Sequence, residues 1–286
     1  MHLRHLACSL LVAAFASQGA LAQCPVGNDL FRFPDAEPPT GPLKPPPGLA
    51  DGAPGPGTTV PDPAKPPYSA FGRLDTLVEG VNRYCTAQLI EGTNVLLTAA
   101  HCVRDNATGN WVSDFRFWRA GKVETTEPLR KPLCIATKKD WVGVPPPPFG
   151  RFFWPADYAF IVLREPLDGP FLKLGSDATA ASVAAFGYPA AIGLRKALIK
   201  TQGQFAKDPD FALGVVQHAD PALGLGMSGG AWVSELTEAG GGTANVVLGL
   251  STTVPTASGA PQLMGPQFTV CAKELLDFAR TACAQQ

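Results

Sequence analysis

The sequence predicts an all-β protein, a sandwich or a pair of barrels, with one helix at the C-terminus. Short apolar segments recur after residue 70, turn residues bound them, and no helical pattern separates them. Many short strands without intervening helices are typical of such folds. The predicted strands cover residues 85–90, 94–100, 115–120, 158–163, 182–189, 197–205, 214–219, 230–235 and 245–251.

Residues 1–22 have the features of an export signal. A short polar region precedes an apolar run that ends in Ala20-Leu21-Ala22, a small-x-small cleavage pattern. The run is too short to span a bilayer, which disfavours an anchoring helix, and Gln23 before Cys24 fits a lipoprotein signal poorly. We expect the mature chain to begin at Gln23 and to be secreted or periplasmic, without membrane association.

Residues 23–70 are rich in proline and glycine. This composition cannot build a core and predicts an extended or disordered segment. It could serve as a linker, a pro-segment or a strap over the domain surface. The folded domain is predicted to cover residues 71–286.

A helical pattern occurs at about residues 268–283. Cys271, Leu275, Phe278 and Ala282 recur there at a spacing that places them on one helical face. We expect this face to dock on a barrel.

Composition excludes several classes of function. The net charge is -1 and only 16% of residues are charged, which predicts no binding to nucleic acid or to anionic lipid. The sequence shows no metal-ligand spacing and no nucleotide-binding loop, so we expect no metal and no cofactor. We also expect a monomer. Seven cysteines are present, and the loss of Cys8 with the signal leaves an even set, which suggests disulfides in an oxidising compartment.

Three motifs carry the chemistry. His101 ends the segment NVLLTAAHC, Asp157 opens ADYAFIVL, and Ser228 lies in the loop GLGMSGGAW. In content and in order they resemble the chymotrypsin-fold serine peptidases. The resemblance implies two six-stranded antiparallel β-barrels with a C-terminal α-helix, and it covers roughly residues 71–280.

The resemblance also implies a role for each residue. Ser228 would be the nucleophile, His101 its general base and then the acid, and Asp157 the group that orients the imidazole. The backbone N–H groups of Gly226 and Ser228 would form the oxyanion hole. Rival residues lack the motifs; these are His218 for the base and Asp105, Asp114 and Asp140 for the acid.

The family further implies a disulfide between Cys85 and Cys102 that holds the histidine loop. Cys24, Cys134, Cys271 and Cys283 then allow three connectivities. A bond between the last two is disfavoured if one helix joins them, since about 1.5 Å of rise per residue separates them too far. Our guess is that Cys134 meets one of that pair.

Met227 stands where animal members of the family carry an aspartate, which pairs with the N-terminal ammonium released by activation cleavage. Methionine cannot make this ion pair. We therefore hypothesise that packing around Met227 preforms the oxyanion loop and that activity needs no processed N-terminus.

Substrate specificity follows from the residues that the resemblance places at the pocket. The floor is expected at Ala222 and Leu223, where no aspartate can hold a basic side chain. The wall is expected at residues 251–253, that is Ser251, Thr252 and Thr253.

Bacterial glutamyl endopeptidases are similar in residues 187–189 and in Asp220. However, they carry a histidine on the wall and a hydroxyl residue on the floor, where this chain has Ser251 and Leu223. We therefore expect a preference for an apolar or small residue before the scissile bond.

The sequence thus predicts an exported serine endopeptidase acting on protein or peptide substrates. One alternative is a catalytically silent or latent homologue that acts as an extracellular binding protein, although silent relatives commonly lose the histidine or the serine. Another is an esterase with the same triad, against which the TAAHC context argues.

Overall fold

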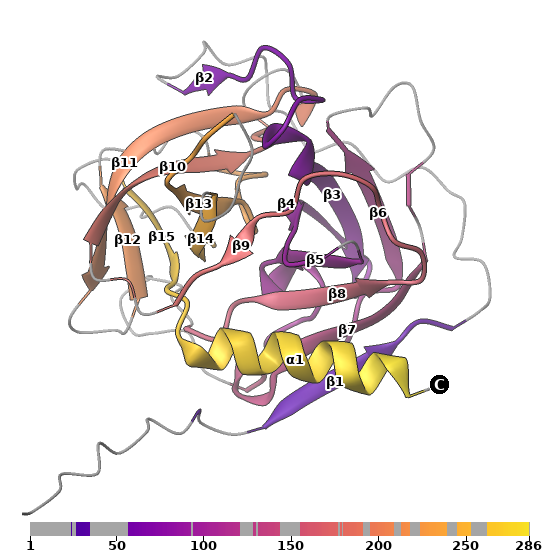
Figure 1. Ribbon diagram of the computed structural model, residues 1–286. Helices are drawn as coiled ribbons and strands as arrows, with labels where there is room; N and C mark the ends of the chain where they lie inside the picture. Colours follow the sequence, from indigo (N-terminus) through magenta and orange to yellow (C-terminus); the bar gives the residue numbers. More distant parts are fainter. Residues whose placement is uncertain are drawn as a thin grey trace, which may run out of the picture.

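The structure is a computed structural model that describes residues 24, 27–34, 57–92, 94–120, 128–129, 131–143, 155–176, 178, 180–190, 195–208, 213–217, 224–238, 245–252 and 262–285. In these ranges the chain forms two curved β-sheets and one C-terminal helix (Figure 1). The predicted all-β class with a C-terminal helix is confirmed. The predicted export signal, residues 1–22, lies outside the described residues.

The first sheet has seven strands in the order β1-β7-β8-β5-β4-β3-β6. Its edge strand β1 is an addition to the six strands that we expected. Glu79 and Gly80, with φ of 51° and 75°, form the two-residue turn between β3 and β4, as hairpins prefer. The strands are β1 (Asn28–Arg32), β3 (Phe71–Val78), β4 (Val81–Leu89), β5 (Val95–Thr98), β6 (Asp114–Arg119), β7 (Pro132–Lys138) and β8 (Ala159–Leu163).

The second sheet has eight strands, seven of them in the order β15-β12-β11-β10-β13-β14-β9, with β2 paired to β11. The short strands β2 and β9 are the additions here, and β9 runs parallel to β14. The strands are β2 (Thr58–Thr59), β9 (Lys173–Leu174), β10 (Ala180–Gly187), β11 (Ile199–Asp208), β12 (Leu213–Gln217), β13 (Ala231–Ser234), β14 (Val246–Leu250) and β15 (Gln262–Pro266).

Each strand predicted from the sequence has a counterpart, but several strands of the structure were not predicted. The longest of these is β3, in which Arg73 and Asp75 interrupt the apolar pattern. Asp75 is only 1% exposed because other charged side chains pair with it. Phe71 of β3 packs against Phe186 of β10, with ring centroids 4.5 Å apart, and so joins the two barrels.

The proline-rich segment differs from its prediction at both of its ends. Residues 28–32 form β1, which pairs with β7 along its full length. Val60 and Tyr68 are buried in the core, and η1 (Tyr68–Ala70) leads into β3. The folded domain therefore includes residues before the predicted boundary at 71, because apolar side chains among the prolines pack on the barrels. Residues 35–56 lie outside the described part.

The C-terminal helix α1 (Val270–Ala284) lies across β8, β7 and β1 of the first barrel (Figure 1). Thr269 caps it by accepting a hydrogen bond from the Cys271 N–H at 3.2 Å. Of the predicted docking face, Leu275 is buried and Phe278 packs on the core while half-buried, but Cys271 and Ala282 lie at the edge of the contact. The buried stripe is rotated by about one residue and comprises Ala272, Leu275, Leu276, Ala279 and Cys283.

Two disulfides fasten the C-terminal helix to other parts of the chain. Cys24 pairs with Cys271, and Cys134 of β7 pairs with Cys283. The rotated stripe explains this pairing, because it turns Cys283 inward to β7 and leaves Cys271 at the helix edge. Among the described residues, no helix has the length and apolar character needed to cross a membrane.

Candidate active site

His101 and Asp157 meet because two strands of the first barrel are neighbours. β5 and β8 pair antiparallel, with Thr98 opposite Ala159. The end of β5 therefore lies beside the start of β8. His101 sits in η2 (Ala100–Cys102), directly after β5, and Asp157 directly precedes β8.

Asp157 holds the histidine at two points. Its Oδ1 accepts the backbone N–H of His101 at 2.8 Å, and its Oδ2 lies 2.8 Å from Nδ1 of the ring. The side chain of Asp157 is 3% exposed and that of His101 is 26% exposed. A buried carboxylate at this place favours the tautomer that carries its proton on Nδ1, and Nε2 then remains an acceptor.

Ser228 comes from the second barrel, on the loop that precedes β13. Its carbonyl oxygen accepts the N–H of Thr86 at 2.8 Å. Thr86 follows Cys85, whose disulfide partner Cys102 follows His101. The structure thus brings Ser228 to the edge of the first barrel near the histidine loop. Within the described residues, no hydrogen bond joins the Ser228 hydroxyl to His101.

Two glycines let the loop pack closely on its surroundings, Gly226 on the segment after β10 and Gly229 on the first barrel. Gly226 has φ of +98°, and a Cβ there would lie 2.2 Å from the carbonyl oxygen of Tyr188. Gly229 has φ of +82°, and a Cβ there would lie 2.3 Å from the carbonyl oxygen of Thr86. A side chain at either position would push the loop off its support.

The loop leaves two backbone donors available. In the described part of the chain, the N–H groups of Gly226 and Ser228 have no acceptor, whereas their neighbours Met227, Gly229 and Gly230 donate to backbone carbonyls. Free N–H groups beside a serine hydroxyl are what an oxyanion hole requires.

Met227 is buried in the core of the second barrel, where it is 1% exposed. A Cβ on Gly187 would lie 2.5 Å from its sulfur, so the methionine packs directly on β10. Apolar packing therefore surrounds the residue before Ser228.

The expected pocket residues are placed only in part. Ser251 is buried, and its hydroxyl accepts the indole N–H of Trp232 at 2.9 Å. Thr252 is buried too, and its hydroxyl lies 3.4 Å from the Met264 carbonyl oxygen. Outside the described residues lie Ala222, Leu223 and Thr253, together with His218 and Asp220.

The polar residues of β4 that hold the serine loop were not predicted from the sequence. Thr86 donates its hydroxyl to the Gly226 carbonyl at 2.8 Å. The side-chain amide of Gln88 donates to the Gly229 carbonyl at 3.0 Å and accepts the Ala231 N–H at 3.2 Å. A threonine and a glutamine two positions apart on the same face of an apolar strand were the available signal.

Cys85, His101 and Cys102 bring potential metal-binding atoms within 4.8 Å of one another. The two cysteines, however, form the disulfide that the family resemblance implied. Disulfide sulfurs do not supply the thiolates that a metal site needs. This cluster is therefore a structural clamp on the histidine loop.

Two β-barrels, with a histidine–aspartate pair on one and a glycine-framed serine on the other, define the chymotrypsin-fold serine proteases. The model of the family described as the trypsin-like peptidase domain matches residues 85–241, more than half of the chain. The chain therefore belongs to the trypsin-like peptidase family, and the protein is a serine endopeptidase. The comparison with curated proteins finds no match.

Solved structures of this class have the same fold. The protease Anisep from Arthrobacter nicotinovorans is 19% identical, with a TM-score of 0.59 over 74% of this chain and 96% of its own. A Glu endopeptidase is 17% identical, with a TM-score of 0.58 over 81% of this chain and 100% of its own. The thermostable serine protease AL20 from an extremophilic microorganism is 21% identical, with a TM-score of 0.54 over 74% and 97%. The predicted two-barrel fold and the family resemblance are confirmed.

Proposed function

We propose that this serine endopeptidase works through a triad of Ser228, His101 and Asp157 and that it acts outside the cytoplasm. The observation that carries the proposal is the double contact of Asp157 with the backbone N–H and Nδ1 of His101, each at 2.8 Å. This contact leaves Nε2 as the free basic atom. The glycine-framed serine approaches the same edge from the other barrel.

In the proposed reaction, the Ser228 hydroxyl oxygen bonds to the carbonyl carbon of the scissile peptide while His101 Nε2 takes the hydroxyl proton. The N–H groups of Gly226 and Ser228 stabilise the resulting oxyanion. His101 then returns the proton to the leaving amine as the C–N bond breaks. Water hydrolyses the acyl-enzyme by the same proton transfers, and Asp157 stays ionised throughout.

Specificity for an apolar or small residue before the scissile bond is part of the proposal. The hydroxyls of Ser251 and Thr252, on the expected pocket wall, are turned to Trp232 and Met264. Ser251 is 1% exposed and Thr252 is 8% exposed, so neither hydroxyl is presented to a substrate carboxylate. Cleavage of a peptide library with a clear preference for arginine or glutamate would contradict this specificity.

Export and activation also belong to the proposal. Three disulfides support an oxidising compartment. The burial of Met227 supports a serine loop that is ordered by packing, without a charged N-terminal partner. A requirement for cleavage near residue 70 to obtain full activity would contradict this part of the proposal.

The direct test is labelling of the purified mature protein with a fluorophosphonate probe. Wild type should be labelled, Ser228→Ala should not, and His101→Ala should be labelled slower by about 10²- to 10⁴-fold, because the general base is lost. His218→Ala and Ser234→Ala are the matched controls and should be labelled like wild type. A folded wild-type protein without labelling, or labelling of Ser228→Ala, would refute the triad.

A further inference from the structure

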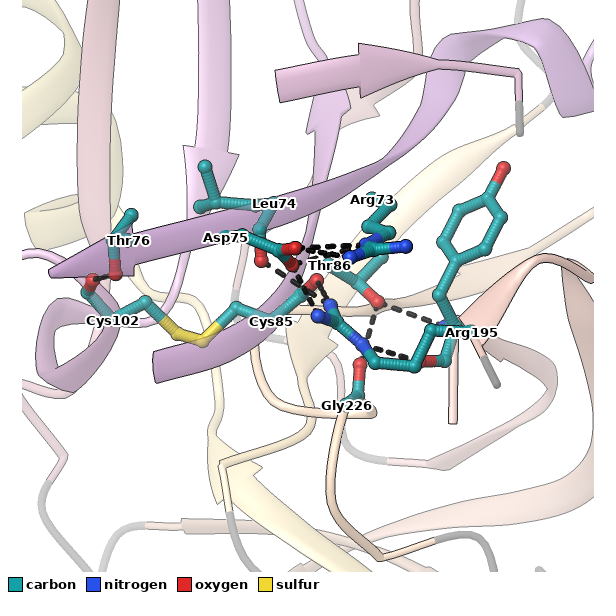
Figure 2. Close-up of polar contacts among 10 residues, drawn as sticks. Arg73, Leu74, Asp75, Thr76, Cys85, Thr86, Cys102, Arg195 and Gly226 are labelled. Atoms are coloured by element: carbon teal, nitrogen blue, oxygen red, sulfur yellow. Dashed lines mark hydrogen bonds and ion pairs between the residues drawn. A yellow bond between two sulfur atoms is a disulfide. The ribbon is translucent and has the colours of Figure 1, made fainter. Parts of the chain in front are cut away.

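Arg195 belongs to the second barrel, just before β11, but its guanidinium group is inserted into the first barrel. It pairs with Asp75 of β3, and both residues are 1% exposed (Figure 2). Arg73 holds the other side of the Asp75 carboxylate through its Nε, at 3.0 Å and 3.1 Å. The pair is thus a buried ionic bridge between the barrels.

The remaining donors of Arg195 bind backbone carbonyls. Its Nη2 donates to Leu74 at 3.2 Å and to Cys85 at 2.6 Å, and its Nε donates to Tyr188 at 3.2 Å. Burial lowers the pKa of this side chain to about 10. A buried ion pair is weak evidence for stability, because desolvation offsets its Coulomb energy. The contribution of the ion pair is therefore the geometry that it imposes on the backbone carbonyls bound to Arg195.

Two of the carbonyls that Arg195 binds, those of Tyr188 and Cys85, connect it to the serine loop. On one side, the Tyr188 carbonyl that Arg195 holds is the group against which Gly226 packs. On the other side, the Cys85 carbonyl precedes Thr86, whose hydroxyl accepts the Tyr188 N–H at 3.0 Å and donates to the Gly226 carbonyl at 2.8 Å. The Thr86 N–H also holds the Ser228 carbonyl at 2.8 Å. Figure 2 shows this chain from Asp75 through Arg195 and Thr86 to Gly226.

The hydrogen bonds fix the carbonyls of Gly226 and Ser228 on the side of the first barrel. The Gly226 N–H shares its peptide plane with the Leu225 carbonyl, which accepts the Ala190 N–H at 2.7 Å, two residues beyond the Tyr188 carbonyl that Arg195 holds. The Ser228 N–H shares its peptide plane with the Met227 carbonyl, which accepts the Gly230 N–H at 2.9 Å, and this plane lies between the two carbonyls that Thr86 holds. The side chain of Met227 between them contributes only packing. The polar contacts that hold the Gly226 and Ser228 carbonyls therefore come from Thr86 of the first barrel, beside a bridge whose partners lie 120 positions apart in the sequence.

We propose that Arg195 and Asp75 are positioning residues, which act through Tyr188 and Thr86 to hold the N–H groups of Gly226 and Ser228 as an oxyanion hole. This inference rests on the proposed function of Ser228. A purely structural contact between the barrels would affect only stability. A positioning role predicts that loss of the bridge slows formation of the acyl-enzyme more than it weakens substrate binding.

The experiment compares Arg195→Lys, Thr86→Val and Thr86→Ser with wild type and with the control Arg119→Lys. Lysine keeps the charge but cannot make the set of hydrogen bonds that the guanidinium makes. Valine removes the Thr86 hydroxyl and serine retains it. Arg119 of β6 donates to the Ser69 carbonyl at 2.6 Å and to the Asp168 carbonyl, and none of its contacts among the described residues is with the serine loop.

For each variant we would measure the melting temperature, the fluorophosphonate labelling rate of the folded fraction, and kcat and KM on one peptide substrate. Arg195→Lys and Thr86→Val should lower the labelling rate and kcat by about 10²-fold, the cost of a misplaced oxyanion donor, with KM nearly unchanged. Thr86→Ser should restore the rate. Arg119→Lys should lower only the melting temperature.

The outcomes separate this inference from the proposed function. If wild type is labelled and Arg195→Lys reacts as fast per folded molecule, the bridge is only structural and the inference is wrong. If folded wild type is not labelled, both proposals fail. If Arg195→Lys does not fold, the Thr86 pair decides, since equal rates for Val and Ser overturn the inference and a loss in Val alone supports it.

Discussion

At the scale of single residues, the candidate site depends on which polar groups are paired and which are left free. Asp157 uses both carboxylate oxygens on His101, so the ring cannot rotate without breaking a hydrogen bond. Thr86 and Gln88 use their side chains on the serine loop. The N–H groups of Gly226 and Ser228 are not used within the described residues. Thr86 and Gln88 therefore hold the serine loop in place, whereas the unused N–H groups remain available for a substrate.

The substitution Asp157→Asn tests this assignment. The amide cannot stabilise the imidazolium and favours the wrong tautomer, a change that lowers kcat by about 10⁴-fold in triads of this class. Peptide hydrolysis measures the loss, and a melting curve shows that the protein still folds. Asp140→Asn is the control. Burial raises the pKa of the Asp140 carboxyl, so losing its charge should cost neither activity nor stability. Equal activity of Asp157→Asn and wild type would exclude Asp157 from the triad.

At the scale of elements, α1 shows that a helix can be predicted correctly from the sequence while its buried face is assigned incorrectly. The apolar residues of this segment cover more than one stripe, and the pattern alone does not select the stripe that docks. Packing of α1 on β7 and β8 accompanies burial of one stripe, Ala272, Leu275, Leu276, Ala279 and Cys283. Cys271 and Ala282 lie at the edges of that contact.

Leu276 distinguishes the two faces. It is fully buried in the structure but lies off the face predicted from the sequence. Leu276→Ala should therefore lower the free energy of unfolding by about 2–5 kcal/mol, whereas Ala282→Ser at the helix edge should change it little. Chemical denaturation of both variants measures the difference. A neutral Leu276→Ala would mean that the helix docks through the other stripe.

At the scale of the whole molecule, both ends of the described chain return to the first barrel. β1 extends the sheet at β7, α1 covers both, and Cys24–Cys271 joins the two segments across 247 positions (Figure 1). Arg32 adds a hydrogen bond to the Ala282 carbonyl at 2.7 Å. A segment that the composition marked as extended is thus a strand of the folded domain.

The substitution Cys24→Ser measures how much this closure contributes. Removing the disulfide should lower the free energy of unfolding by about 2–5 kcal/mol, because the unfolded chain regains the freedom of a long loop. Labelling by the fluorophosphonate probe should stay at the wild-type rate, since the bond is remote from Ser228. Mild reduction of wild type should reproduce the loss of stability. An unchanged melting temperature would show that β1 is held by strand pairing alone.

The sequence by itself determined the fold class, the strands with uninterrupted apolar patterns, and the residues of the candidate triad. These are local signals, since strand periodicity and short glycine or histidine motifs lie within a few neighbouring positions. Only the tertiary structure decided that β3 holds a buried Asp75, that residues before 71 join the barrels, and which face of α1 docks. It also placed Arg195 and Thr86 behind the serine loop. Each of these depends on partners distant in the chain, because a charge or a polar side chain is tolerated inside a protein only where another segment pairs with it.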